Sequence, residues 1–216
     1  MIKSSVGERL DLLIHKLFPF LFLRPLNPDL LTVTGALVSA GAAAAFVQGR
    51  LVLGGVLILA GGFFDLVDGV VARHQGISTR FGAFLDSTLD RFVDMALFVG
   101  IAVHFAHLGD AGSVLLTGVA LTATALVSYS KARAELYVPS FEVGLLERGE
   151  RVGLLAAGAI LDLLIPALWI IAIGSTITVA QRFALAKREL DRLDADEKSA
   201  GTRPAPGTGE LQEPTT

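Results

Sequence analysis

Apolar residues in this chain form long runs separated by short polar stretches, and most runs are long enough to cross a membrane. A bilayer core about 30 Å thick requires roughly 20 mostly apolar residues in a helix. Measured against that length, the sequence predicts six helices, over residues 30–47, 51–72, 81–107, 113–134, 152–164 and 167–186. The fifth run is short, and Pro166 is predicted at the turn that follows it. We therefore predict an all-α integral membrane protein with six transmembrane helices.

The two ends of the chain have a different pattern. Residues 1–26 mix charged and apolar positions without an uninterrupted apolar run, which predicts an amphipathic helix on the membrane surface and no cleaved signal peptide. Residues 191–216 are rich in Pro, Gly, Thr and charge, which predicts a disordered tail. The predicted organisation is thus a juxtamembrane segment at 1–26, a membrane domain at 27–190 and a tail at 191–216.

Positive charge marks alternate loops. Lys and Arg occur before the first predicted helix, between the second and third, between the fourth and fifth, and after the sixth, whereas the other loops hold only Arg50. Because Lys and Arg are retained on the cytoplasmic side of short loops, we expect a multi-pass protein of the cell membrane with both termini in the cytoplasm.

Composition narrows the possible chemistry. The residues are 52% hydrophobic and 18% charged, with a formal net charge of -3, which argues against a nucleic-acid partner. The chain has no cysteine, so a metal must be held by oxygen or imidazole ligands.

Acidic side chains are concentrated in the second and third predicted helices. Asp65 and Asp68 are three residues apart, and Asp86 and Asp90 are four apart, so each pair shares one face of its helix. Carboxylates that converge within a bundle repel one another, and they either take up protons or need compensating cations. Mg²⁺ or Mn²⁺ suits such an oxygen-rich site, and Asp94 extends the same face as a support for Arg91 or for a metal ligand.

Two other interpretations of these acids use the same residues. A structural salt-bridge network would pair them with Arg73, Arg80 and Arg91, although ionisable residues at membrane depth usually have a function. A divalent-cation transporter would place them along an ion path. Gly69 with Arg73 one turn later favours phosphate binding over transport.

Two stretches, DLVDGVVAR at 65–73 and GAFLDSTLD at 82–90, resemble the signature of the CDP-alcohol phosphotransferase family. The resemblance implies a homodimer of six-helix chains that transfers the phosphatidyl group of CDP-diacylglycerol to an alcohol. It implies two Mg²⁺ ions, with Mn²⁺ as an alternative, held by Asp65, Asp68, Asp86 and Asp90, with Asp90 also serving as general base. The residues implied for CDP-diacylglycerol binding are Pro28, Asp29, Leu30, Leu31, Gly69, Arg73 and Thr79.

Three further elements, SYSKARAE at 128–135, ERGER at 147–151 and QR at 181–182, resemble those of family members whose acceptor is inositol phosphate, the phosphatidylinositol phosphate synthases. By that resemblance the acceptor phosphate is bound by Ser128, Lys131, Arg151 and Arg182. Charge-assisted hydrogen bonds of this kind favour a phosphorylated acceptor over serine or plain inositol. Glycerol 3-phosphate also carries a phosphate, so a phosphatidylglycerophosphate synthase is the alternative within the family.

Overall fold

The computed structural model describes residues 27–75, 79–138, 141 and 143–201. The predicted surface helix at 1–26 and the last fifteen residues of the predicted tail, 202–216, lie outside the described residues. The described regular structure is helical throughout, as predicted. Its elements are α2 (Pro28–Val47), α3 (Leu51–Gln75), α4 (Arg80–His107), α5 (Ala111–Ala134), α6 (Arg148–Ile160) and α7 (Leu164–Gly201).

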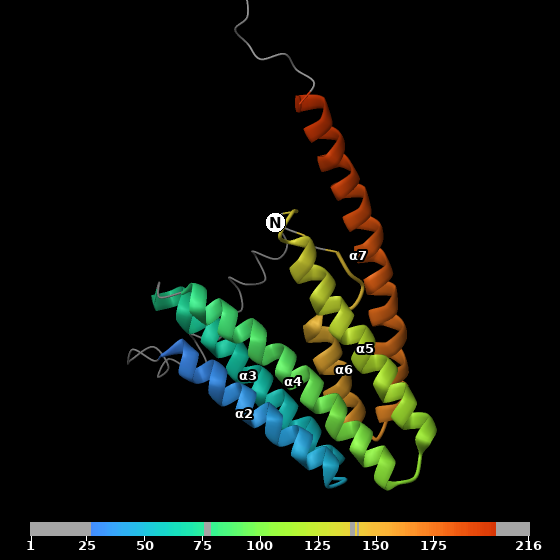
Figure 1. The fold of residues 1–216 in the computed structure, drawn as a ribbon. Coiled ribbons are helices and arrows are strands. Elements are labelled where there is room, and N and C mark those ends of the chain that lie inside the picture. Colours follow the sequence, from blue (N-terminus) through green and yellow to red (C-terminus); the bar gives the residue numbers. More distant parts are fainter. Residues whose placement is uncertain (1–26, 76–78, 139–140, 142, 202–216) are drawn as a thin grey trace, which may run out of the picture.

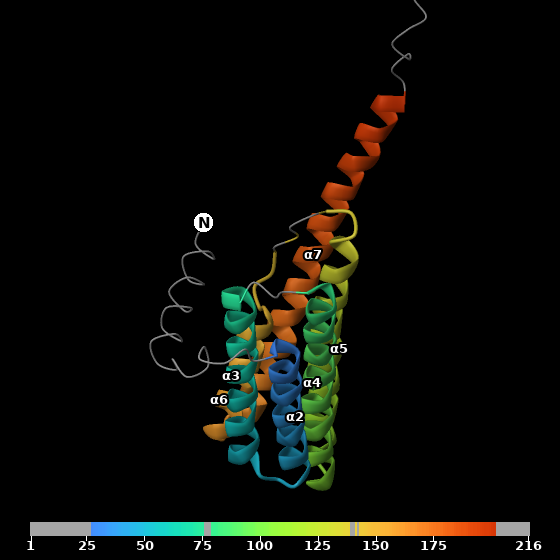
Figure 2. The ribbon, with the colours of Figure 1, turned by 90° about the vertical axis from the view of Figure 1, so that its left-hand side faces the viewer.

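The six helices form a ring of neighbours. α2 packs against α3 and α4, α4 against α5, α5 against α7, α7 against α6, and α6 against α3. Figure 1 shows α2, α3 and α4 side by side in one half of the bundle, and Figure 2 shows α7 extending well past the other helices. The helices that carry the predicted acids, α3 and α4, are therefore joined mainly through α2.

Small residues allow α2 to approach both of its neighbours closely. A Cβ atom added to Gly61 of α3 would clash with the Ser39 hydroxyl and lie 2.9 Å from the Gly35 carbonyl oxygen, both on α2. A Cβ added to Gly100 of α4 would lie 2.5 Å from the Ala43 carbonyl oxygen, also on α2. Small side chains at helix contacts are typical of membrane bundles, where backbones pack closely.

Local caps fix where the helices begin. The Asn27 side chain accepts a hydrogen bond from the Asp29 backbone N–H at 3.0 Å, and Pro28 follows as the first helical residue. The Thr79 hydroxyl accepts one from the Gly82 N–H at 2.8 Å at the start of α4. Asn27 and Thr79 thus place the first turns of α2 and α4.

Within the described residues, four helical segments are long and apolar enough to cross a membrane: Pro28–Val47, Leu51–Val71, Ala111–Ala134 and Leu164–Asp196. This supports a membrane protein. α4 has 28 residues and carries the charges of the acidic cluster, whereas α6 has only 13 residues. At 1.5 Å per residue, α6 is about 20 Å long, shorter than a bilayer core.

Two boundaries differ from the predicted ones. α6 ends at Ile160, and the turn to α7 includes Asp162 with a φ of 59°. The prediction of Pro166 at the turn was wrong: Pro166 lies in the first turn of α7, where its missing N–H needs no partner. α7 then continues to Gly201, past the predicted start of the tail at 191, through residues that are mostly good helix formers.

Candidate active site

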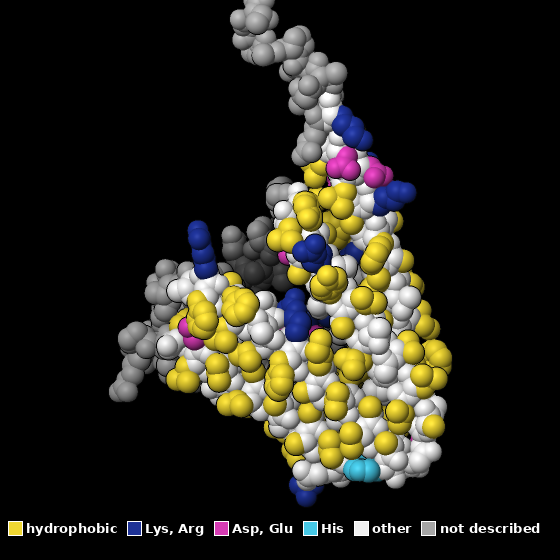
Figure 3. Space-filling model, in the orientation of Figure 1, with side chains coloured by type: hydrophobic (Ala, Val, Ile, Leu, Met, Phe, Trp, Pro, Cys, Tyr) yellow, Lys and Arg dark blue, Asp and Glu magenta, His cyan; other side chains and the backbone are white. Residues whose placement is uncertain are grey.

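Charged side chains from several helices meet near one end of the bundle. This end is formed by the start of α2, the last turns of α3, the start of α4 and the start of α6. Figure 3 shows a recess between the two halves of the molecule with basic side chains at its base. Asp65 and Asp68 reach this region from α3, and Asp86 and Asp90 reach it from α4.

Asp68 is the most buried of the four predicted metal ligands, with 6% of its surface exposed. Its Oδ2 accepts a hydrogen bond of 2.6 Å from the Thr32 hydroxyl of α2. The negative charges of Asp65 and Asp86 both act on Asp68 and on each other. Three of the four acids therefore interact unfavourably unless a cation lies among them.

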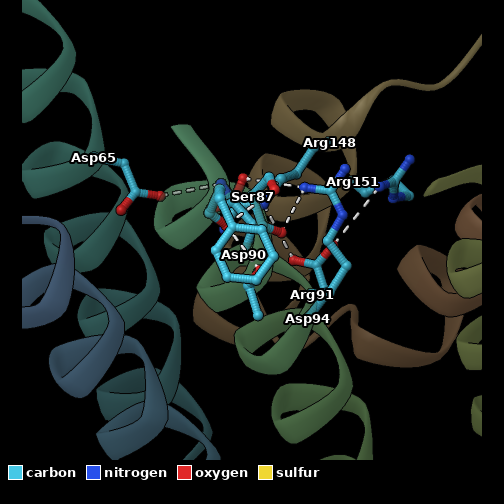
Figure 4. A network of polar contacts seen from close by, with 9 residues as sticks. Asp65, Ser87, Asp90, Arg91, Asp94, Arg148 and Arg151 are labelled. Carbon is cyan, nitrogen blue, oxygen red and sulfur yellow. Dashed lines mark hydrogen bonds and ion pairs between the residues drawn. The ribbon is translucent and has the colours of Figure 1, made fainter. Parts of the chain in front are cut away.

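A guanidinium lies among some of the acids in this structure. Arg148, the first residue of α6, lies 3.0 Å from Asp65 Oδ2 through Nη1 and 2.9 Å from Asp90 Oδ1 through Nη2. Its Nε lies 3.4 Å from Asp94 Oδ1. Figure 4 shows Asp65 pointing across from α3 toward this group. Arg148 thus connects the acidic faces of α3 and α4.

Asp94 is buried behind this contact, with 7% of its surface exposed. Besides Arg148, it lies 3.7 Å from Nη2 of Arg151, so its ionic partners come from α6. Arg91, the partner expected from the sequence, instead lies 3.6 Å from Asp90 and donates to the Ser87 carbonyl oxygen at 2.9 Å. Asp94 therefore supports two arginines of α6, Arg148 and Arg151, rather than Arg91.

The donor set suits a hard divalent cation, since all four predicted ligands offer carboxylate oxygens and the chain has no thiols. The need for positive charge is visible in the contacts that Arg148 makes with Asp65 and Asp90. Among the described residues, no three His, Asp or Glu side chains are gathered closely enough to hold one ion. Metal ligation by these aspartates would therefore require side chains of the cluster to rearrange.

The residues expected to bind CDP-diacylglycerol lie beside the acids. Pro28 and Asp29 begin α2, and a Cβ added to Gly82 of α4 would lie 3.0 Å from Asp29 Oδ1, so these two helix starts are in contact. Thr79 caps α4. The others are Leu30, which is exposed, and Leu31 and Gly69, which are half-buried. The Arg73 backbone belongs to α3, and its side chain lies outside the described residues.

The residues expected to bind the acceptor come from three helices. Ser128 and Lys131 lie one turn apart on α5, and Lys131 is 3.7 Å from Glu135. Arg151 of α6 and Arg182 of α7 each have only 4% of their surface exposed. Their positive charges act on each other, so these two buried guanidinium groups repel. An anion placed between them would relieve that repulsion.

Backbone carbonyl groups anchor both arginines. Arg151 Nη1 donates to the Leu146 carbonyl oxygen at 3.0 Å, and Arg182 Nε donates to that of Val143 at 2.9 Å. Arg182 Nη1 also donates to the Val127 carbonyl oxygen of α5. Each arginine therefore has a fixed position and keeps further N–H groups for other partners.

Arg148 is the site residue that the sequence-based assignment missed. It occurs in the ERGER element three residues before Arg151, a spacing that puts both side chains on one face of α6. That spacing was the available signal. Which acids Arg148 meets depends on the rotation of α6 against α3 and α4, which the sequence does not contain.

Comparison with known proteins identifies the family of the chain. Residues 26–181 match the family model of CDP-alcohol phosphatidyltransferases. A phosphatidylinositol phosphate synthase of Streptomyces avermitilis is 40% identical over 205 residues, covering 88% of this chain and 83% of that protein. An archaetidylinositol phosphate synthase of Methanothermobacter thermautotrophicus is 43% identical, covering 65% of this chain and 69% of that protein.

Solved structures share the fold. The phosphatidylinositol phosphate synthase of Mycobacterium tuberculosis with CDP-DAG bound aligns with a TM-score of 0.70 at 31% identity, over 84% of this chain and 94% of that one. Its complex with manganese and citrate also gives 0.70, at 35% identity, over 74% of this chain and 82% of that one. Together with the match over residues 26–181, these relatives establish that the chain belongs to the CDP-alcohol phosphatidyltransferase family of membrane enzymes.

Proposed function

We propose that this chain transfers the phosphatidyl group of CDP-diacylglycerol to inositol phosphate, giving phosphatidylinositol phosphate and CMP. The observation that carries the choice of acceptor is the pair of buried, mutually repelling arginines, Arg151 and Arg182, beside the aspartate cluster. Two buried positive charges favour an acceptor that brings its own negative charge. Relatives named for inositol phosphate lipids add to this support.

The aspartates of α3 and α4 are proposed to hold the metal. Asp65, Asp68, Asp86 and Asp90 would ligate two Mg²⁺ ions, with Mn²⁺ as the alternative. Bound there, the ions would supply the positive charge that neutralises the diphosphate of CDP-diacylglycerol. On the donor side, Gly69, Arg73 and Thr79 would bind the diphosphate and cytidine, and residues 28–31 would bind beside them.

Asp90 is proposed to be the general base. It is half-buried on α4 and pairs with Arg148 of α6, the helix that also carries Arg151. From there its carboxylate would accept the proton of the attacking hydroxyl group, while Ser128, Lys131, Arg151 and Arg182 orient the acceptor through its phosphate. The hydroxyl oxygen then forms its bond to phosphorus as the bond to CMP breaks.

A direct assay tests the acceptor. Purified protein in detergent is given CDP-diacylglycerol and Mg²⁺ with inositol phosphate, glycerol 3-phosphate, inositol or serine, and CMP release is measured. We expect turnover chiefly with inositol phosphate. Comparable turnover with glycerol 3-phosphate would replace the proposal with a phosphatidylglycerophosphate synthase.

The alternative that the protein is a divalent-cation transporter rather than an enzyme is tested with protein in sealed vesicles. Metal uptake without any CDP-lipid would support transport. A strict requirement for CDP-diacylglycerol in every metal-dependent process would exclude it. The family membership of the chain already favours the transferase.

We further propose that all six predicted helices cross the cell membrane, that both termini are cytoplasmic, and that the enzyme is a homodimer. The start of α2 and the far end of α7 lie toward the same end of the bundle, in keeping with termini on one side (Figure 1). Accessibility of single introduced cysteines to a membrane-impermeant reagent tests the orientation. Light scattering of the purified protein tests the dimer, and a monomeric mass would exclude it.

A further inference from the structure

Arg148 contacts more acidic groups of the candidate active site than any other basic side chain whose ion pairs the structure describes. Each of its three guanidinium nitrogens has a different acidic partner. Nη1 lies 3.0 Å from Asp65, Nη2 lies 2.9 Å from Asp90, and Nε lies 3.4 Å from Asp94. These partners come from two helices, and Arg148 itself begins a third. A single residue of α6 therefore supplies positive charge to both acidic faces.

The contacts with Asp65 and Asp90 involve two of the four proposed metal ligands. Arg148 donates a hydrogen bond of 3.0 Å to one oxygen of Asp65, which draws that oxygen away from a metal ion. Arginine keeps its charge at all physiological pH values, so this side chain always repels a cation bound to the same carboxylates. A divalent ion ligated by Asp65 and Asp90 would therefore compete with Arg148 for them.

Asp94 gives the displaced side chain another partner. It lies four residues after Asp90, so it occupies the same face of α4 one turn deeper in the bundle. Its Oδ1 lies 3.4 Å from Arg148 Nε, and neither of these two buried atoms has a hydrogen-bond partner among the described residues. A small rotation of the guanidinium toward Asp94 would give both atoms a hydrogen-bond partner.

We propose that Arg148 is the internal counter-cation of the aspartate cluster, which releases Asp65 and Asp90 to divalent metal and retains Asp94. The inference rests on the proposed two-metal site and adds a residue that opposes metal binding. Arg148 then has two effects. It stabilises the acids when no metal is bound, and it lowers the affinity of the site for the ion.

Mn²⁺ binding to the full-length purified protein, without CDP-lipid or acceptor, tests this directly. Free Mn²⁺ is measured by electron paramagnetic resonance for the wild type, for Arg148→Gln and for Arg50→Gln, which removes an equal charge at the other end of the bundle. We expect Arg148→Gln to bind Mn²⁺ at least about tenfold more tightly, a difference of 1.4 kcal/mol. Arg50→Gln should stay within about twofold, because the charge of an exposed, distant group is screened.

Thermal unfolding provides a second measurement. In excess chelator, Arg148→Gln should unfold at a lower temperature than the wild type, and added Mn²⁺ should raise its midpoint by more. If Arg148→Gln does not fold, Arg148→Lys takes its place. Its single ammonium group cannot reach all three carboxylates, so a smaller gain in Mn²⁺ affinity is expected.

The possible failures can be told apart. If the wild type binds Mn²⁺ through Asp86 but the Arg148 variant binds it no more tightly, the counter-cation role alone would be overturned. A wild type that binds no Mn²⁺, or whose binding survives Asp86→Asn, would remove the two-metal site and this role with it. Asp86 is suited to that control because it is a proposed metal ligand other than the three carboxylates that Arg148 contacts, which are those of Asp65, Asp90 and Asp94.

Discussion

The two ends of the bundle treat polar groups in opposite ways. At the end away from the site, Gly49 and Gly109 adopt φ values of 74° and 72° in tight turns, and Asp110 caps α5 through hydrogen bonds to the Ser113 N–H and hydroxyl. At the site end, acids and arginines are buried, and within the described part of the chain Asp94 Oδ1, Arg148 Nε and Arg151 Nε lack hydrogen-bond partners. One end satisfies its polar groups locally, whereas the other buries charged groups whose polar atoms are only partly hydrogen-bonded.

The largest expected difference between the two ends is catalytic. Asp90→Asn removes the proposed base and a metal ligand, and should reduce CMP release by at least about 100-fold. Asp162→Asn is the matched control at the opposite end, since Asn tolerates the φ of 59° found there. Its activity should remain close to that of the wild type. Full activity of the Asp90 variant would exclude its role as base.

A smaller effect is expected from one of the acceptor residues. Lys131→Gln removes one charge-assisted hydrogen bond to the acceptor phosphate and should raise the KM for inositol phosphate roughly 10- to 100-fold, with a smaller change in kcat. Arg133→Gln removes the same charge from an exposed position two residues along α5. Steady-state kinetics of both variants test whether Lys131 binds the phosphate directly. If the positive charges only attract anions in general, the two variants should change KM equally.

Packing below the site gives a third comparison, between adjacent glycines of α3. An added methyl group at Gly61 would clash with Ser39, whereas a Cβ at Gly62 would meet nothing within 4 Å. Gly61→Ala should lower the free energy of unfolding by about 1–3 kcal/mol. Gly62→Ala should leave it unchanged or raise it slightly, because Ala favours the helix. Thermal midpoints in detergent measure both, and equal midpoints would contradict close contact between α2 and α3.

The smallest effect belongs to the end without a site. Two hydrogen bonds from Ser113 hold the pKa of the Asp110 carboxyl below its usual range. The ionised cap therefore stabilises the fold above the unfolded pKa of about 4, and this contribution is lost as the pH falls through the folded pKa. Asp110→Ala should lower the midpoint by roughly 1–3 °C at neutral pH.

Two further measurements test the charge of the Asp110 cap: the same comparison of midpoints at lower pH, and the variant Asp110→Asn. The difference in midpoint between wild type and Asp110→Ala should shrink as the pH falls below the folded pKa. Asp110→Asn, which still accepts a hydrogen bond but does not titrate, should show no such change in its difference from Asp110→Ala. A difference that is independent of pH for the wild type would exclude a charged cap.

Much of the fold follows from the sequence because it depends on local patterns. Apolar run length predicted all six described helices to within a few residues at most ends. A proline next to a turn was harder to place, since it is equally compatible with the turn and with the first turn of the next helix. The length of α7 was also missed, because charged helix formers such as those after residue 190 occur in exposed helices and in tails alike.

The site was predictable in part. Spacing alone put Asp65 with Asp68 and Asp86 with Asp90 on shared helix faces, and resemblance supplied the proposed roles. The sequence could not show that Arg148 connects the two faces, or that Asp94 faces α6. Both depend on how helices that are distant in sequence rotate against one another. The alternative of a salt-bridge network named arginines of α3 and α4, whereas most of the close contacts come from α6.

The glycine contacts of α2 have a consequence for the nearby acids of α3 and α4. α2 lies against both α3 and α4, with Gly61 and Gly100 at the points of closest approach. The spacing that α2 keeps between α3 and α4 determines the distance between the acids of α3 and those of α4. In the proposed mechanism a phosphoryl group would bind between these acids, so the separation that α2 imposes would affect catalysis. Selection on catalysis should therefore reach residues such as Gly61 that touch no substrate.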